Sequence, residues 1–337
     1  MVSADAEFTA LAGYLICGYY ALKWMPVKKE FMMFIMLLPM TLQQAASLNY
    51  DSMAFGISFL LIAYLLHLKY KAETIEWKNL LAVCIMTMIL LITKLPYACL
   101  ALLAFTVPHE KYNFKIGRFD IGHVVYKFRY ILLALAAVLV AVVAVMVQSS
   151  LYLNAFKAAI VKFPTFIRLI INSFRIRGVW YMGGMLGCLG WIDTPLNGVQ
   201  YLVICLMAVW LSQAGKKEAV VAAEKGSSTI KNRVALFGII LLIFLLIFAS
   251  MLSWTTMIYE WETPQTLQQW KESLMNMDNI YGVQGRYFLP CLPLAALVVR
   301  DIIPIPSKGV QAGLRVYCLV GWISLTITLL ARYWMLL

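Results

Sequence analysis

Charge is scarce in this sequence. Only 13% of its 337 residues are Asp, Glu, Lys or Arg, whereas a soluble domain carries about 25%. Hydrophobic residues make up 63% of the chain, so too few polar side chains remain to cover a water-soluble surface. The shortage of charge excludes an ordinary soluble globular protein and indicates a chain that is solvated by lipid.

Acidic residues are scarcer still. The chain has 28 Lys and Arg against 16 Asp and Glu, which gives a net charge of +12. Such an excess is typical of nucleic-acid-binding proteins and of membrane proteins whose loops face anionic headgroups. No basic run is interleaved with aromatic residues on a soluble face, so we expect the lipid bilayer as a partner and no nucleic acid.

Metal-ligating residues are few and scattered. There are three His, and the seven Cys form no Cys-x-x-Cys pair and lie almost entirely within apolar runs. Cysteines in that setting are typically small apolar packing residues. We therefore expect no metal site, no disulfide framework and no cofactor.

Long apolar runs, in contrast, are abundant. A spanning helix needs about 20 apolar residues, and continuous runs without alternation favour helices over a β-barrel. We predict an all-α, polytopic transmembrane helical bundle that forms a single domain over residues 1–337 and has about ten spans, some short or broken. The predicted spans lie near 8–24, 31–48, 53–68, 79–94, 96–107, 130–150, 198–213, 234–254, 287–300 and 316–335.

The orientation of the bundle follows from its Lys-rich and Arg-rich connections, which favour the cytoplasm. These connections lie near residues 23–29, 69–78, 108–129 and 214–233. All four are cytoplasmic only if residues 79–107 cross twice or re-enter the membrane. The Leu95-Pro96 step after Lys94 predicts that break, because proline disfavours helix at the preceding residue. The N-terminus then lies outside.

Two segments are predicted to lie on the outer side. Residues 255–286 form an outer loop that carries several acids and aromatic residues. Residues 151–197 carry Lys and Arg but no acid before Asp193. This basic segment is either an interfacial amphipathic helix, which we favour, or a sign that the predicted topology is wrong there.

The first candidate site residues are one acid and one cation. Asp51, at the outer end of a predicted span, either faces a cavity, where it binds a hydroxyl or a cation, or caps the next helix. Lys94, between two apolar half-spans, either holds a phosphate as a point charge or snorkels to the interface.

Glycine-rich segments supply the other candidates. Residues 183–195 contain four glycines followed by Trp191 and Asp193, and the alternative is a tight loop with Thr194 as a helix N-cap. Residues 282–290 contain Gln284, Arg286 and Tyr287. Arg286 suits bidentate phosphate binding, and the alternative is an interfacial Arg–Tyr anchor.

All these candidates fall on the predicted outer face. They give a pocket with two cations, Lys94 and Arg286, and two acids, Asp51 and Asp193. Such a pocket suits a phosphate-bearing lipid together with a polar acceptor. No catalytic residue is assigned by these patterns.

Four of these motifs, in this order, resemble a bacterial family of predicted membrane proteins with a domain of unknown function (family 2142). Their order and spacing match from about residue 8 to the end of the chain. The motifs are Leu38-Pro39-Met40 followed by Ser47-x-x-Tyr50-Asp51, Lys94-Leu95-Pro96-Tyr97, Leu189-Gly190-Trp191-Ile192-Asp193-Thr194-Pro195, and Gln284-Gly285-Arg286-Tyr287-x-x-Pro290.

That family looks like the GT-C class of glycosyltransferases. The resemblance implies a multi-pass enzyme of the bacterial plasma membrane that transfers a sugar from a polyprenyl-phosphate donor, at the outer face, to an envelope polysaccharide or lipid acceptor. The class usually carries a catalytic acid in the loop after its first helix. This sequence lacks that helix and loop, so we expect either a shortened product or a non-catalytic relative.

Two other classes of function stay open. A transporter or flippase of a lipid-linked saccharide suits broken helices with charge between them. A non-catalytic subunit of an envelope-assembly complex would not need the acidic loop.

Overall fold

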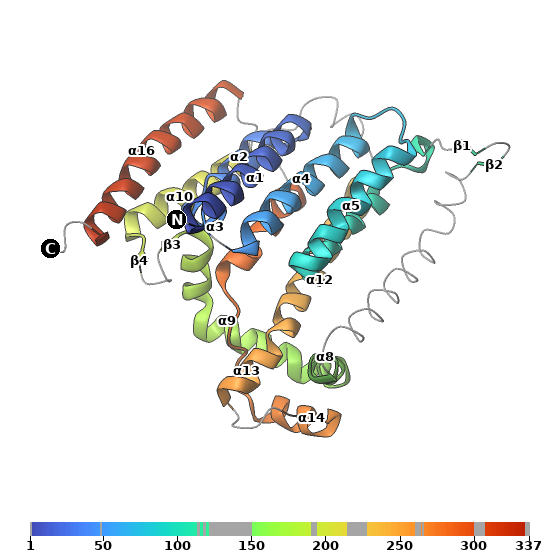
Figure 1. Cartoon of the computed structure of the whole chain (residues 1–337), viewed down its shortest axis with the longest axis vertical. Helices are drawn as coiled ribbons and strands as arrows, with labels where there is room; N and C mark the ends of the chain where they lie inside the picture. The colour runs from blue at the N-terminus through green and yellow to red at the C-terminus, as the bar shows by residue number, and fades with distance from the viewer. Residues whose placement is uncertain are drawn as a thin grey trace.

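The computed structural model describes residues 2–47, 49–112, 115–116, 119–120, 150–189, 194–213, 228–259, 264, 266–299 and 307–333. These residues are nearly all helical, which confirms the predicted all-α class (Figure 1). Two short antiparallel pairs, β1 (Lys115–Ile116) with β2 (Phe119–Asp120) and β3 (Cys188–Leu189) with β4 (Thr194–Pro195), are the strands of the described part.

The helices form a bundle from which a smaller group of helices extends. In chain order they are α1 (Val2–Trp24), α2 (Lys29–Met36), α3 (Pro39–Ala45), α4 (Tyr50–Tyr70), α5 (Trp77–Thr93), α6 (Leu95–Ala98), η1 (Cys99–Thr106), η2 (His109–Lys111), α8 (Ser150–Val161), α9 (Phe163–Leu186), α10 (Gly198–Ser212), α12 (Ser228–Ser250), α13 (Leu252–Tyr259), α14 (Leu267–Asn276), η3 (Gly285–Cys291), α15 (Leu292–Val298) and α16 (Ser307–Tyr333).

Three helical stretches of the described residues are long and apolar enough to cross a membrane, namely Tyr50–Tyr70, Ile230–Thr256 and Gly309–Arg332. Four shorter apolar helical stretches accompany them. The predicted membrane-spanning helices are therefore present, but the predicted number of ten is not confirmed. Residues 130–149 of the predicted span at 130–150 lie outside the described residues, and Ser150 is the first residue of α8.

Prolines divide two of the apolar runs. The predicted span at 31–48 is two helices, because Pro39 opens α3 and has no N–H to continue α2. The run at 79–107 breaks at Lys94, which lies between α5 and α6 with φ −156° and ψ 86°. The break predicted from Leu95-Pro96 is confirmed.

Helix α4 is largely buried within the bundle, and α1 packs along it and runs parallel to it. A methyl group added at Gly56 of α4 would touch Cys17 of α1. Farther along both helices, the rings of Trp24 and Tyr64 lie 5.0 Å apart. Because both helices run in the same direction, the start of α1 lies at the same end of the bundle as Asp51.

The opposite end of the bundle carries a set of lysines. Lys111 Nζ donates to the backbone oxygen of Lys69 at 2.7 Å, where α4 ends. Lys28 Nζ donates to the backbone oxygen of Ser212, at the end of α10. The lysines of the described parts of these connections, Lys28, Lys69 and Lys111, therefore lie at the end away from Asp51.

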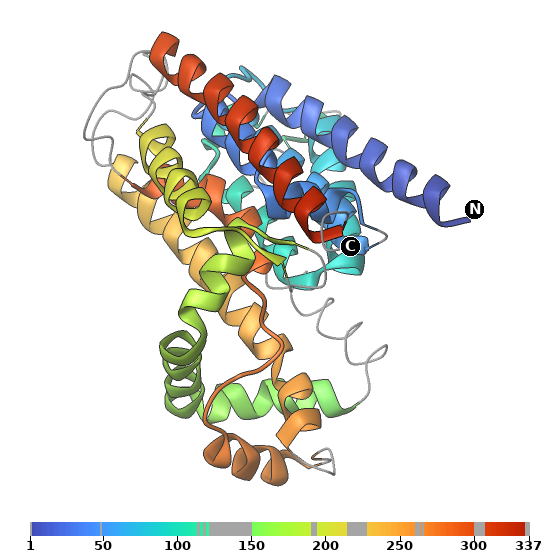
Figure 2. The same cartoon turned by 90° about the vertical axis from the view of Figure 1, so that its left-hand side faces the viewer.

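The smaller group of helices, which we call the appendage, consists of α8, residues 163–177 of α9, α13 and α14. It lies below the bundle in Figures 1 and 2. Ser173 Oγ of α9 accepts a hydrogen bond from the backbone N–H of Ile280 at 2.8 Å, and Asn172 Nδ2 donates to the backbone oxygen of Asp278 at 3.2 Å. Helix α9 continues from the appendage into the bundle.

One predicted cap is wrong. Thr194 and Pro195 form β4 and pair with β3, so they do not begin a helix. Helix α10 begins three residues later, with Asn197 as its N-cap, and the side chain of Asn197 accepts from the backbone N–H of Gln200 at 2.9 Å. Thr194 cannot cap a helix here because it is part of the β3–β4 pair.

Candidate functional site

One buried carboxylate holds together three segments of the chain. Lys94 Nζ lies 2.6 Å from Oδ1 of Asp51, and Arg286 Nε lies 3.3 Å from Oδ2. The Asp51 side chain is 2% exposed, against 11% for Lys94 and 17% for Arg286. Three residues predicted from three separate motifs thus meet at one place, which we call the charged cluster.

Asp51 is placed by the start of α4. Asn49 is the N-cap of this helix, and its Oδ1 accepts from the backbone N–H of Asp51 at 3.4 Å. The alternative in which Asp51 itself caps the helix is therefore wrong. Its carboxylate is instead directed to Lys94 and Arg286, and it lies in the first turn of α4, where the helix dipole favours a negative charge.

Tyrosine rings surround the cations of the cluster. Lys94 Nζ lies 3.7 Å from the ring centroid of Tyr287, 5.5 Å from that of Tyr97 and 5.8 Å from that of Tyr50. Arg286 Cζ lies 5.7 Å from the Tyr287 ring. These distances permit cation–π attraction, which helps to keep Lys94 charged beside apolar helices.

Tyr50 and Tyr97 are site residues that the sequence analysis did not single out. Tyr97 is fully buried, and its hydroxyl donates to the backbone oxygen of Tyr287 at 3.0 Å. Tyr50 is 60% exposed. Tyr50 directly precedes Asp51, and Tyr97 follows shortly after Lys94. This closeness in sequence to two candidate residues is the signal that could have identified both tyrosines.

Arg286 is placed by close packing of η3 against α9. A Cβ atom at Gly285 would overlap the backbone oxygen of Tyr181 and lie 2.6 Å from the backbone nitrogen of Met185. Only glycine allows this approach of two backbones. The position of the Arg286 side chain therefore depends on α9.

Gln284 precedes the same turn. Its backbone oxygen accepts from the N–H of Tyr287 at 3.0 Å, which starts η3. Its side-chain Oε1 is buried and accepts no hydrogen bond from the described residues. This oxygen is a buried acceptor two residues before Arg286 in the chain.

Trp191 and Asp193, the remaining predicted site residues, lie outside the described residues, between β3 and β4. Helix α3 packs against β3 and also against η3. Strand β3, which ends shortly before Trp191 in the chain, therefore contacts a helix that also contacts η3, the segment of Arg286.

The charges of the cluster do not cancel. One carboxylate faces two cations, so a formal charge of +1 is left among Asp51, Lys94 and Arg286. Because these groups are largely removed from water, that charge is weakly screened. The cluster is suited to an anion that approaches from the partly exposed side of Lys94 and Arg286. Among the described residues, no three His, Cys, Asp or Glu side chains gather as metal ligands.

Comparison with known proteins places the chain in a family. The family described as "Predicted membrane protein (DUF2142)" matches residues 8–295, which include the charged cluster. No curated protein and no solved structure matches the chain. On the match over most of its length, the chain belongs to the DUF2142 family of predicted membrane proteins.

Proposed function

We propose that the chain is a membrane glycosyltransferase-like protein of the bacterial plasma membrane. Its charged cluster binds the phosphate of a polyprenyl-phosphate-linked sugar at the outer face, and the acceptor is an envelope polysaccharide or a lipid. The observation that carries the proposal is the convergence of Lys94 and Arg286 on Asp51, which leaves one positive charge in excess.

A phosphate matches the donors that this cluster offers. Arg286 contacts Asp51 at Nε, and a guanidinium has four further N–H donors in a planar fork that fits phosphate oxygens. Lys94 adds a compact point charge, with donors that rotate. Asp51 keeps the two cations together when no phosphate is bound, because they would otherwise repel each other.

The reaction that we propose is direct displacement at the anomeric carbon of the sugar. The acceptor oxygen forms a bond to that carbon while the bond to the phosphate oxygen breaks, and the acceptor proton passes to a base that is not assigned. Lys94 and Arg286 stabilise the negative charge that develops on the departing phosphate. Asp193 and Trp191 are the candidates for contacts with the acceptor.

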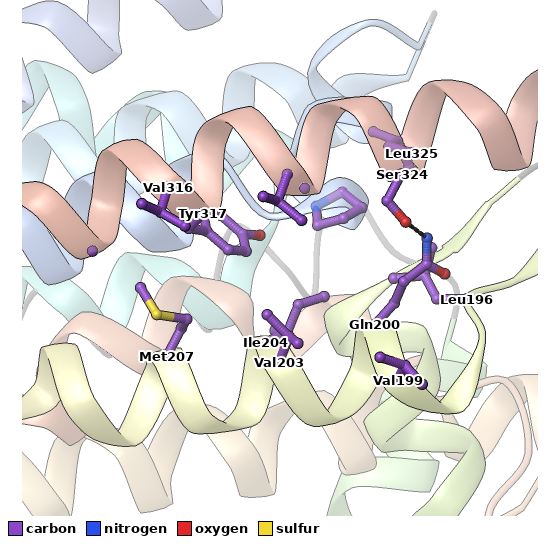
Figure 3. Close-up of a pocket in the computed structure, with 14 residues that line it drawn as sticks. Leu196, Val199, Gln200, Val203, Ile204, Met207, Val316, Tyr317, Ser324 and Leu325 are labelled. Carbon is purple, nitrogen blue, oxygen red and sulfur yellow. Dashed lines mark hydrogen bonds between the residues drawn. The ribbon is translucent and has the colours of Figure 1, made fainter.

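An apolar groove between α10 and α16 supplies a surface for the hydrocarbon chain of the donor. The groove has a volume of about 460 Å³ and lies between side chains such as Val203 and Val316 (Figure 3). Gln200 is hydrogen-bonded to Ser324 at one end. Pro39 also lines the groove and begins α3, the helix that precedes the Asp51 segment.

The decisive experiment is transfer of a labelled sugar from polyprenyl phosphate in membranes that contain the chain. We expect Arg286→Ala to lower the rate strongly, because the departing phosphate loses its guanidinium. Lys78→Ala is the matched control, since Lys78 is an exposed cation near the opposite end of α5 from Lys94. Equal rates for Arg286→Ala and the native chain would eliminate the proposed role of Arg286.

A flippase for a lipid-linked saccharide is the second candidate. The observation that favours it is the helix break at Lys94, because transporters often bind substrates at interrupted helices. Movement of a labelled lipid-linked sugar across proteoliposomes without covalent transfer would decide for this function. Activity that appears only with a co-purifying protein would instead identify a subunit of an assembly complex.

A further inference from the structure

Helix α9 exposes a stripe that mixes cations with apolar side chains. Arg168, Ile171, Arg175 and Val179 follow one another at intervals of three or four residues, so they share one face of the helix. Ile171 is 61% exposed and Val179 is 90% exposed. Ile171 and Val179 are therefore not packed against the described remainder of the protein.

Helix α8 also exposes a mixture of apolar side chains and a cation. Phe156 and Ile160 are 41% and 59% exposed, and Lys157 beside them is exposed. Lys162, at the junction with α9, is half-buried. We call Phe156, Lys157, Ile160, Lys162, Ile171 and Arg175 the basic face.

The basic face belongs to a segment that contains cations and no acidic residues. Residues 150–189 contain five Lys and Arg and no Asp or Glu. Two of the five have partners: Arg168 donates to the backbone oxygen of Met275 at 3.3 Å, and Arg177 Cζ lies 3.9 Å from the ring centroid of Tyr281.

The remaining three cations lack a partner among the residues that the structure describes. Lys157, Lys162 and Arg175 form no ion pair or hydrogen bond within the described part of the chain. On α14, which packs against α8, Glu272 accepts a hydrogen bond from Gln268. Within residues 150–189 themselves, no carboxylate offsets the five cations.

A face of this composition suits neither bulk water nor the hydrocarbon core. Exposed Phe and Ile side chains favour removal from water, while Lys and Arg are costly in hydrocarbon. Both requirements are met at the level of the lipid headgroups, where basic amphipathic helices bind. The charge complementarity favours anionic phosphates.

The position of the basic face in the molecule agrees with a location at the lipid headgroups. Helix α9 begins in the appendage and ends in the bundle (Figures 1 and 2), where Gly184 packs against Gly285 beside Arg286. The basic face is therefore on the same end of the bundle as the charged cluster, away from Lys69 and Lys111.

We propose that the basic face docks on the phosphate headgroups of anionic phospholipids in the leaflet at that end, with Lys157, Lys162 and Arg175 as the phosphate-binding side chains. Phe156, Ile160 and Ile171 enter the boundary between headgroups and acyl chains. This docking holds the appendage on the membrane surface and does not depend on the sugar-transfer function.

Photo-crosslinking tests this placement. The full chain is reconstituted in phosphatidylcholine vesicles that contain a trace of phosphatidylglycerol with a photoactivatable headgroup, and the labelled peptides are mapped. We expect label on residues 156–182. In the triple variant Lys157→Gln, Lys162→Gln and Arg175→Gln, labelling of this segment should fall by about fivefold for each cation removed.

The same samples contain the controls. Labelling of the lysine-rich segments at the opposite end should not change in the triple variant, which shows that the bundle is intact. A phosphatidylcholine probe that carries the same photoactivatable group on its own headgroup should label residues 156–182 weakly. Equal labelling by both probes, unchanged labelling in the triple variant, or no label on this segment in the native chain would each overturn the proposal. The last result would mean that a protein or another surface covers the face.

Discussion

Asp51 pairs with cations on two different segments, so its replacement leaves both cations without a carboxylate. We expect Asp51→Asn to destabilise the chain by about 3–5 kcal/mol, the usual cost of removing one partner from a buried pair. Thermal unfolding in detergent measures the effect. Asp278→Asn serves as the control, because Asp278 is an exposed acid near the appendage.

The double variant Asp51→Asn with Lys94→Met removes one of the stranded cations as well. It should regain part of the lost stability, because the introduced amide then faces Arg286 alone. If the double variant were less stable than Asp51→Asn by the full effect of Lys94→Met alone, the two residues would not be coupled and the ion pair would contribute little.

Tyr287 contributes its ring to the charged cluster. Lys94 Nζ lies 3.7 Å from the ring centroid, so Tyr287→Leu should lower the stability by at least the about 0.5–2 kcal/mol of a cation–π contact. Tyr287→Phe keeps the ring and should unfold close to the native temperature. A loss of the same size in both variants would assign the effect to the hydroxyl group.

The candidate residues were predictable from sequence, but their partners were not. Charge in or beside an apolar run is costly and therefore marks Asp51, Lys94 and Arg286 individually. Their pairing depends on how α4, α5 and η3 pack, which no local pattern contains. Tyr97 was missed for the same reason, because its role depends on the backbone oxygen of a distant residue, Tyr287.

At the scale of elements, the contact between α9 and η3 is the most constrained. Gly285→Ala would bring a methyl group onto the backbone of Tyr181, and two helices would have to separate. We expect a loss of about 1–3 kcal/mol in thermal unfolding, as is usual for overpacking, together with weaker binding of polyprenyl phosphate as Arg286 shifts.

Gly178→Ala is the matched control for that prediction. Gly178 lies on the same helix, and a Cβ atom there would meet nothing within 4 Å. Alanine has the higher helix propensity, so stability should stay the same or rise. A loss in Gly178→Ala equal to that in Gly285→Ala would show that flexibility of α9, and not its approach to η3, is required.

The groove between α10 and α16 gives a separate prediction. Val203→Trp places a large ring in the groove and should reduce binding of polyprenyl phosphate to the purified chain without lowering its unfolding temperature. Leu202 is the neighbouring residue, 58% exposed, and is not among the side chains that line the groove. Leu202→Trp should therefore bind as the native chain does, and equal losses in both variants would argue against the groove.

The breaks between elements were easier to predict than their caps. A proline has no N–H to donate to a preceding helical turn, so α2 and α5 end before Pro39 and Pro96, which lie in the first turns of α3 and α6. A cap such as Thr194 requires that its segment be free to start a helix. Thr194 is instead paired with Leu189 across the β3–β4 ladder, and Asn197 takes over as the cap.

The whole molecule has two chemically different ends. One end carries Asp51 and the basic face, and the other carries Lys28, Lys69 and Lys111. A membrane-impermeant amine reagent applied to right-side-out vesicles should therefore label Lys157 and leave Lys29 unlabelled until the vesicles are opened. Labelling of both lysines in sealed vesicles would contradict a single orientation of the bundle.

The number of spans could not be settled from composition. A run of apolar residues predicts burial in lipid or in protein equally well, and α2 and α3 show one predicted span divided into two short helices. Helix α9, in contrast, was not predicted as a span although part of it packs in the bundle. Its cations argue against a span, and only the packing of its last turns on η3 shows that it joins the bundle.

The order in which the charged cluster is synthesised has its own consequence. Lys94 follows Asp51 by 43 residues, so these two residues leave the ribosome close together and can enter the membrane as a neutral pair. Arg286 arrives much later, after α9 and α12 have been made. We therefore expect the early half of the bundle to insert without a net charge at this position, and the anion site to become positive only when the last third of the chain is in place.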